Sequence, residues 1–376
     1  MDEANVAIVG AGPAGSSAAR RAAEAGCNTI MLEKDRFAGE TTVCGGGLMA
    51  SRPPCGIDLP DWIVEKKIST SLVYLPNQTY VFEGHPGLSF QRCIFDRYLA
   101  EEAVRRGADL LVSSRVTDVQ PHRDAVVVHY TRRDDQRVYK LKADLLIFAD
   151  GPNTLARKFG LGFPSGQPKK TALAALYELE WKDNPLDCFE FFFDKQVSPW
   201  GYGWIIPKRD VLNVGMGCLI SKLRSNIRAY LDYFVQSYPL TAGRLGGLKK
   251  VRFAAAVIPI DHAPRISANR ILIAGAAAGM VDPIWGGGID KSIKAGVIAG
   301  EVAADAMRHR RFDHEFLSEY DRRWKSTIDY NYLRRAHYAQ EVFLGYSRLD
   351  RNALFRFMQL VLRKLKATKV KKGRPS

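Results

Sequence analysis

A glycine triplet near the start of the chain constrains the fold more than any other feature of the sequence. Gly10, Gly12 and Gly15 follow a short apolar run, 6–9, that is typical of a buried strand. The alanine- and arginine-rich segment 14–25 then indicates a helix. Glycines in this spacing allow a tight turn and bring the backbone N–H groups of the helix N-terminus close to a pyrophosphate. The pattern therefore predicts a strand-turn-helix unit that binds a dinucleotide.

An acidic residue completes this dinucleotide signature. The segment 29–32 indicates a second strand, and Glu33 follows it directly. A carboxylate at the end of the second strand can bind the paired hydroxyls of a ribose. Pro13 and Ala14 in the first turn and Lys34 after the acid belong to the same expected binding region. The alternative is a tight turn that binds no ligand, but it gives no reason for an acidic residue at Glu33.

Composition places the chain among ordinary globular proteins. Its 376 residues are 46% hydrophobic and 25% charged, which excludes a disordered or fibrous chain and allows two or three domains. No apolar run approaches the roughly 18 residues that span a bilayer, and no signal peptide precedes the first strand. The six cysteines form no C-x-x-C pair, so we expect no metal site and a cytoplasmic chain with reduced thiols.

The positive charge gathers at the C-terminal end. The formal net charge is +15, and the segment 348–376 holds most of the excess. Leu354, Phe355 and Met358 begin a helical apolar pattern there, interleaved with arginine and lysine over 352–372. This segment either makes a peripheral contact with an anionic membrane or packs on the body with a solvated tip. No recognition motif accompanies the charge, so nucleic acid is not an expected partner.

Several later segments carry a family resemblance. Arg92-x-x-Phe95-Asp96-x-x-Leu99 begins an expected helix, and an expected strand ends at Asp150-Gly151. Another expected strand leads into Ala274-Gly275-Ala276-Ala277-Ala278-Gly279-Met280, then Asp282-Pro283 and Gly286-Gly287-Gly288-Ile289. Together these resemble the flavoprotein superfamily that includes p-hydroxybenzoate hydroxylase. The resemblance implies FAD, with the ADP half at the first motif and the ribityl chain and ring at the late one.

Two further segments narrow the resemblance. Cys44-Gly45-Gly46-Gly47 and Pro199-x-x-Tyr202-x-Trp204-x-Ile206-Pro207 are similar to signatures of the geranylgeranyl reductases. That family uses FAD to hydrogenate isoprenoid C=C bonds in ether lipids, chlorophyll side chains or quinone tails. The resemblance runs from about residue 4 to about residue 340 and implies an isoprenoid or lipid substrate.

The resemblance also implies an α/β fold: a Rossmann-like FAD-binding domain with an inserted antiparallel β-sheet substrate domain and C-terminal helices. We expect the FAD-binding domain over 1–70, 88–165 and 252–310, and the substrate domain over 71–87 and 166–251. The helical region with its basic tail is expected over 311–376.

The implied site residues fall into two groups. The catalytic candidates face the substrate: Cys44, Tyr202 and Trp204. The cofactor-binding candidates come from the motifs above: Gly10, Gly12, Pro13, Ala14, Gly15, Glu33, Lys34, Cys44, Gly45, Gly46, Arg92, Asp150, Gly151, Gly275, Ala276, Pro283, Gly286, Gly287, Gly288 and Ile289. On residue type alone, a free cysteine is more often a small buried hydrophobe, and two alternating aromatics are more often core.

A loop of three glycines before a helix has a physical use in such a site. Without a Cβ, Gly286, Gly287 and Gly288 allow the backbone to approach a flavin closely. The N-terminus of the following helix would stabilise negative charge on the reduced ring.

One departure from the family leaves two alternatives open. The family usually has Asp where this chain has Ala276, which removes a charge-assisted hydrogen bond worth roughly 1.5–3 kcal/mol. A non-enzymatic, membrane-associated flavin-binding homologue is therefore one alternative. A flavin-dependent monooxygenase or halogenase of the same fold is the other, and the segment at Cys44 argues against it.

The electron donor stays open between three classes. The sequence has no second glycine-rich dinucleotide motif, so no resident nicotinamide domain is expected. The donor is NAD(P)H bound transiently, a ferredoxin or a reduced deazaflavin. The basic surface suits an acidic ferredoxin, on charge alone.

Overall fold

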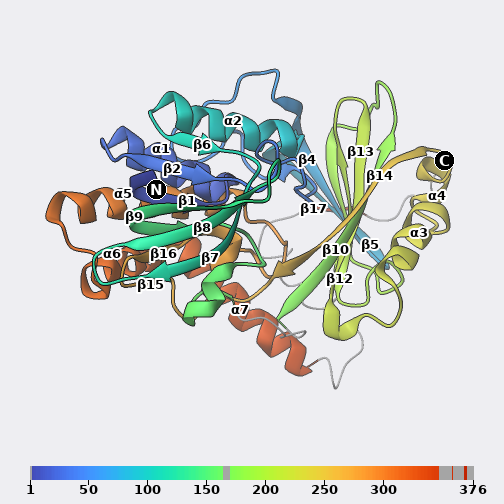
Figure 1. Cartoon of the computed structure of the whole chain (residues 1–376). Coiled ribbons are helices and arrows are strands. Elements are labelled where there is room, and N and C mark those ends of the chain that lie inside the picture. The colour runs from blue at the N-terminus through green and yellow to red at the C-terminus, as the bar shows by residue number, and fades with distance from the viewer. Residues whose placement is uncertain (1, 164–169, 347–357, 359–367, 371–376) are drawn as a thin grey trace.

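The computed structural model describes residues 2–163, 170–346, 358 and 368–370. Two β-sheets organise these residues (Figure 1). The first carries the N-terminal strands and is covered by helices, and the second lies beside it with two short helices on its outer side. An α/β fold with a separate second sheet was expected and is confirmed.

The first sheet has a parallel core built as the glycine triplet predicts. Its strand order is β6-β2-β1-β9-β16, with β15 as an antiparallel edge, and β7 and β8 pair antiparallel beside β9. All residues of β2 are buried, as expected for a parallel strand covered on both faces. The strands are β1 (Asp2–Val9), β2 (Thr29–Leu32), β6 (Asp109–Leu111), β7 (Ser114–Pro121), β8 (Val126–Arg132), β9 (Val138–Phe148), β15 (Ser267–Ala268) and β16 (Ile271–Ile273).

Helices α1 (Pro13–Glu24) and α5 (Ile289–His309) cross at glycines. A Cβ on Gly296 of α5 would collide with the carbonyl oxygen of Ala14, and one on Gly300 with that of Ala18. The two backbones therefore approach more closely than side chains would allow. This contact sets the beginning of α5 beside the beginning of α1, and α2 (Arg92–Arg105) packs on the other side of α1.

The second sheet follows the order β14-β10-β13-β12-β11-β4-β5-β17, with β3 on β5. Its strands are β3 (Gly47–Leu48), β4 (Val64–Leu75), β5 (Gln78–Phe90), β10 (Thr171–Glu180), β11 (Cys188–Phe192), β12 (Gly201–Pro207), β13 (Val211–Leu219), β14 (Lys249–Pro259) and β17 (Thr368–Val370). The expected antiparallel arrangement holds except between β11 and β4, which pair in parallel. That pair joins segments far apart in the chain, so no tight turn fixes an antiparallel direction.

The two faces of the second sheet have different neighbours. Phe192, Leu231 and Phe234 form the core under α3 (Ile227–Gln236) and α4 (Ala242–Leu245). Trp204 and Phe189 lie on the opposite face, in a cluster that includes Val43 from the loop after β2. This second face therefore looks toward the first sheet and its loops.

Some expected boundaries differ from the structure. The expected domain limits at 70/71, 87/88 and 251/252 fall inside β4, β5 and β14, each of which lies wholly in the second sheet. By sheet membership, the hairpin 64–90 and β14 go with the second sheet, and so does the short strand β3. A domain division along these lines remains our proposal.

The helical region expected over 311–376 begins with two helices. These are α6 (His314–Ser326) and α7 (Ile328–Tyr346), and Thr327 takes an extended conformation between them. Short 3₁₀ turns occur at Leu155–Phe159, Ile220–Lys222 and Gly275–Ala278. Apart from Met358, the helix expected over 352–365 lies outside the described residues. Within the described ranges, no helix is long and apolar enough to cross a membrane.

Candidate active site

The first loop has the geometry of a pyrophosphate cradle. Gly10 has a φ of +93°, and a Cβ there would lie 2.6 Å from the carbonyl oxygen of Ala149. A Cβ on Gly15 would collide with the carbonyl oxygen of Gly10. Gly12 faces open space, with no atom within 4 Å of its ideal Cβ, and Pro13 begins α1 directly after it. Two glycines thus close the turn, and the third leaves room for a ligand.

The acid after β2 is fixed toward this loop. Glu33 is buried; its Oε2 accepts a hydrogen bond from the Ala11 N–H at 2.9 Å and its Oε1 one from the Asp35 N–H at 3.0 Å. The carboxylate is therefore positioned beside the cradle. Lys34 turns to other partners, since its ammonium pairs with Asp35 at 2.6 Å and donates to Thr41 at 2.9 Å.

Asp150 and Gly151 follow β9 at the same edge of the sheet. Asp150 Oδ2 accepts from the Leu155 N–H at 2.8 Å, whereas its buried Oδ1 has no hydrogen-bond partner among the described residues. Burial raises the pKa of Asp150, against the hydrogen bonds from Thr154 and Leu155. A buried acceptor without a hydrogen-bond partner destabilises the folded protein. This oxygen is therefore suited to accept a hydrogen bond from a bound ligand. Gly151 has a φ of +78° and open space around it.

The late loop lies against the first one. Gly275 has a φ of +69°, and a Cβ there would lie 2.8 Å from the Ala14 Cβ and 3.1 Å from the Ser292 hydroxyl of α5. Ala276, the next residue, is partly exposed. The structure therefore brings together two motifs that are far apart in the sequence, at the N-termini of α1 and α5.

Replacing Ala276 with aspartate is expected to tighten FAD binding about tenfold or more, because one charge-assisted hydrogen bond is worth about 1.5 kcal/mol at the least. Fluorescence titration of the cofactor-free chain measures this, with Ala276→Asn as the uncharged control. Equal affinities for the wild type and Ala276→Asp would contradict the expected position of the loop.

Asp282 organises the loop before α5, and the site prediction omitted it. Its Oδ1 accepts from the N–H groups of Ile284 and Trp285 at 2.8 and 3.0 Å. Its Oδ2 accepts from the Tyr332 hydroxyl of α7 at 2.7 Å. Asp282 thus orients the turn that begins at Pro283. The Asp-Pro pair was visible in the sequence, but the contact with Tyr332 was not.

The three glycines after this turn lead into α5. Gly286 has a φ of +65°, Gly287 faces open space, and Gly288 caps the helix without a side chain. Ile289, also predicted to bind the cofactor, has its side chain buried in a core cluster with Phe95. Its backbone, but not its side chain, is therefore placed for a ligand.

The Cys44 loop is tied to the second sheet. The Gly46 N–H donates to the Cys44 sulfur at 3.4 Å, and the Asn213 amide donates to the Cys44 carbonyl oxygen at 3.4 Å. Asn213 Oδ1 in turn accepts from the Trp204 indole at 2.9 Å. A Cβ on Gly45 would lie 2.6 Å from Ile206, so the glycine is needed for this close packing. Cys44 and Trp204 are thereby linked through one buried amide.

Two buried cations flank Cys44. Arg92 makes two hydrogen bonds of 2.8 Å to Asp96. Burial opposes the charge of Arg92, but Asp96 and the Cys44 side chain together raise its pKa. Lys208, which the site prediction omitted, donates to Gln91 at 3.0 Å and lies 3.7 Å from the Glu178 carboxylate. Burial lowers the pKa of Lys208, while Glu178 and Cys44 act in the opposite direction.

An aromatic cluster connects the sheet to the late loop. The ring of Tyr202 lies 5.8 Å from Phe191, 5.1 Å from Phe193, 6.0 Å from Trp204 and 6.2 Å from Trp285, between centroids. Its hydroxyl donates to the Trp285 carbonyl oxygen, and burial raises its pKa. We call these five residues the aromatic wall. Trp285 was not predicted to belong to this wall, because its contacts are with residues far away in the chain.

The geometry fits a flavin dinucleotide. Within the described part of the chain, neither α1 nor α5 has a side chain that caps its N-terminus, so both can receive negative charge from a ligand. Open space at Gly12 and the unmatched oxygen of Asp150 lie in neighbouring loops, which follow the paired strands β1 and β9. The residues present thus match the cofactor that the sequence resemblance implies.

Comparison with known sequences agrees with this geometry. The family described as FAD dependent oxidoreductase matches residues 5–194, and the geranylgeranyl reductase catalytic domain matches residues 171–251. Digeranylgeranylglycerophospholipid reductase 2 from Methanopyrus kandleri is 33% identical over 94% of this chain and 89% of its own length. The protein of that name from Methanothermobacter thermautotrophicus is 32% identical over 94% of this chain and 91% of its own length.

Solved structures give the same result. A geranylgeranyl bacteriochlorophyll reductase-like protein from Thermoplasma acidophilum aligns with a TM-score of 0.82 and 26% identity, covering 91% of this chain and 87% of its own. A flavin-dependent brominase aligns at 0.69 with 18% identity, over 95% of this chain and 93% of its own, which is a likeness of fold alone. The chain therefore belongs to the geranylgeranyl reductase family and is an FAD-dependent oxidoreductase.

Proposed function

We propose that this oxidoreductase saturates C=C bonds of geranylgeranyl groups in a lipid. The observation that carries the proposal is the aromatic wall, which joins the Cys44 side of the second sheet to the glycine loop before α5. Flat apolar rings suit a prenyl chain. The names of the relatives, digeranylgeranylglycerophospholipid reductases, support a lipid over a quinone or a chlorophyll-like substrate.

The cofactor would be held along the edge where the two motifs meet. Gly10, Gly12 and Gly15 would receive the pyrophosphate at the N-terminus of α1, and Glu33 would bind the ribose. The backbone at Gly286–Gly288 would face the ring, and the N-terminus of α5 would stabilise negative charge there. FAD, when bound, supplies the hydride for the reduction.

Cys44 would complete the reduction as a proton donor. Addition of a hydride to one alkene carbon requires a proton at the other. Arg92 and Lys208 lie close enough to the Cys44 side chain for it to influence the pKa of each. The Gly46 N–H fixes the sulfur from the loop side. Tyr202 and Trp204 would hold the chain and exclude water.

The direct test uses the FAD-loaded chain, reduced with dithionite without oxygen and mixed with a digeranylgeranyl glycerophospholipid in detergent. Mass spectrometry should show the lipid gaining two hydrogens for each bond reduced. An unchanged lipid beside a reduced flavin would contradict the proposal. A halogenated or hydroxylated product on admitting oxygen would favour the monooxygenase alternative, and failure to bind FAD the non-enzymatic one.

Cys44→Ser is expected to lower the turnover about 100-fold or more, since general acid catalysis typically contributes at least that much. The affinity for FAD should change little, because the serine keeps the size and the backbone contacts. Cys55→Ser is the matched control at an exposed cysteine and should keep wild-type turnover. Equal turnover in the two variants would remove Cys44 from the chemistry.

We also propose that the protein meets its lipid at a membrane surface. Helix α7 exposes apolar side chains, with Ile328 88% exposed and Tyr338 71% exposed. The net positive charge supports attraction to anionic lipid. Electrons would come from NAD(P)H, a ferredoxin or a reduced deazaflavin that visits the flavin.

A further inference from the structure

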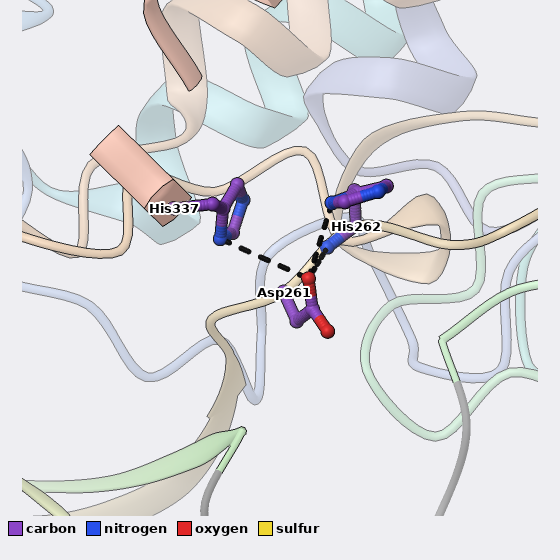
Figure 2. A group of neighbouring side chains, drawn as sticks. All are labelled: Asp261, His262 and His337. Carbon is purple, nitrogen blue, oxygen red and sulfur yellow. Dashed lines mark hydrogen bonds and ion pairs between the residues drawn. The ribbon is translucent and has the colours of Figure 1, made fainter. Parts of the chain in front are cut away.

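A cluster of three potential metal ligands lies outside the proposed active site. Asp261 and His262 follow β14, and His337 lies on α7 (Figure 2). One ligand atom from each residue lies within 4.8 Å of the other two. His262 Nδ1 is 3.1 Å and His337 Nδ1 3.9 Å from the same oxygen, Oδ1 of Asp261.

The carboxylate of Asp261 is already oriented for such a role. Its Oδ2 accepts from the Lys170 ammonium, and its Oδ1 accepts from the His262 backbone N–H at 2.9 Å. Lys170 thereby holds the outer oxygen and leaves Oδ1 turned to the two imidazoles. Partners of this kind commonly fix the carboxylate ligands of metal sites.

His337 supplies the second, independent observation. The residue is 7% exposed, and its buried Nε2 has no hydrogen-bond partner among the described residues. Its Nδ1 lies 3.9 Å from Asp261 Oδ1, which is too long for a hydrogen bond. The separations of 3.1 and 3.9 Å between Asp261 Oδ1 and the two imidazole Nδ1 atoms bracket the separation of about 3.3 Å between two ligands of one tetrahedral ion.

We propose that Asp261, His262 and His337 bind a divalent transition-metal ion. Two imidazoles and a carboxylate are the ligand types that suit Zn²⁺ and similar borderline cations. A hollow of about 160 Å³, lined by His262, His337, Met280 and Trp324, leads to the cluster. It gives an ion a path of entry and gives a water molecule room for the fourth position.

The proposed ion would join α7 to the late loop of the cofactor site. A Cβ on Gly279 would collide with the Asp261 carbonyl oxygen, and the Ala263 N–H donates to the Ala278 carbonyl oxygen at 2.9 Å. Asp261 therefore packs directly behind the loop that begins at Gly275. An ion there ties His337 to this loop, and its role is structural, independent of the reduction proposed above.

The test is calorimetric titration of the FAD-loaded, full-length chain with ZnCl₂, after dialysis against a chelator. The wild type should bind Zn²⁺ in a saturable process that raises the melting temperature. His262→Ala and His337→Gln should each weaken this binding about 10-fold or more, whereas His122→Ala, at an exposed position between β7 and β8, should not.

Two outcomes would overturn the proposal: absence of saturable binding in the wild type, or unchanged binding in both cluster variants. The second would place any bound zinc at other groups, such as the free cysteines. The side chain of His262 is 58% exposed, so its replacement should not disturb folding, and the flavin spectrum of each variant checks this.

Discussion

Replacing Gly12 with threonine is expected to weaken FAD binding at least about 100-fold, or about 2.7 kcal/mol. No atom lies within 4 Å of the ideal Cβ of Gly12, so the folded chain has room for the new side chain. That room is where the pyrophosphate would approach the N-terminus of α1. Gly12 is the N-cap of α1, a position where threonine and glycine are about equally good, so the stability of the cofactor-free chain should hardly change.

Titration of the cofactor-free variant with FAD and its thermal melt separate these two effects. Gly243→Thr is the matched control, since Gly243 also faces open space but lies in α4, away from the site. Gly15→Ala gives the contrast: its Cβ would collide with Gly10, so the fold itself should be weakened. If Gly12→Thr bound FAD as tightly as the wild type, the cofactor would not lie in this cradle.

Replacing Asp96 with alanine is expected to destabilise the protein by about 3–5 kcal/mol. Asp96 is fully buried and holds Arg92 through two hydrogen bonds of 2.8 Å. Its removal leaves a largely buried guanidinium without its counter-charge, and that loss is large. Because Arg92 also lies beside Cys44, the variant should lose activity below its new melting temperature as well.

The same helix provides the control for this prediction. Arg97 and Glu101 form a pair with the same spacing, but their side chains are 62% and 42% exposed. Glu101→Ala should therefore cost less than about 1 kcal/mol. Urea unfolding of both variants measures the difference. Similar losses in the two would show that burial of Arg92 does not matter.

Short sequence patterns predicted the strands, helices and turns whose conformation depends mainly on neighbouring residues. The strand at 29–32 agrees with β2, and the helix expected from Ala14 begins one residue earlier, at Pro13. The turn between β1 and α1 depends on Gly10 and Gly15, where a Cβ would collide with the backbone, so the sequence shows it directly. Phe189, Phe191 and Phe193 alternate with Phe192 in the sequence, and in the structure Phe192 lies in the core under α3, separate from the other three.

Pairings between distant segments could not be predicted in this way. The turn of the β4–β5 hairpin, Pro76–Asn77, carries a local signal, but the place of the hairpin beside β11 depends on the whole sheet. Lys208 and Trp285 contact site residues far away in the chain, Gln91 and Tyr202, and the hydrogen bond between Asp282 and Tyr332 is equally long-range. In the sequence, His262 and His337 are too far apart to form a metal-ligand motif. In the folded chain, α7 places His337 beside Asp261 and His262.

The glycine crossing of α1 and α5 limits where the molecule can open. With Gly296 and Gly300 seated on the carbonyl groups of Ala14 and Ala18, neither helix can slide or roll without separating the two backbones. The α1–α5 pair beside the proposed nucleotide site is therefore expected to be rigid. If a long hydrocarbon needs space to enter, we expect the second sheet to move rather than the α1–α5 pair, which would separate substrate entry from retention of the cofactor.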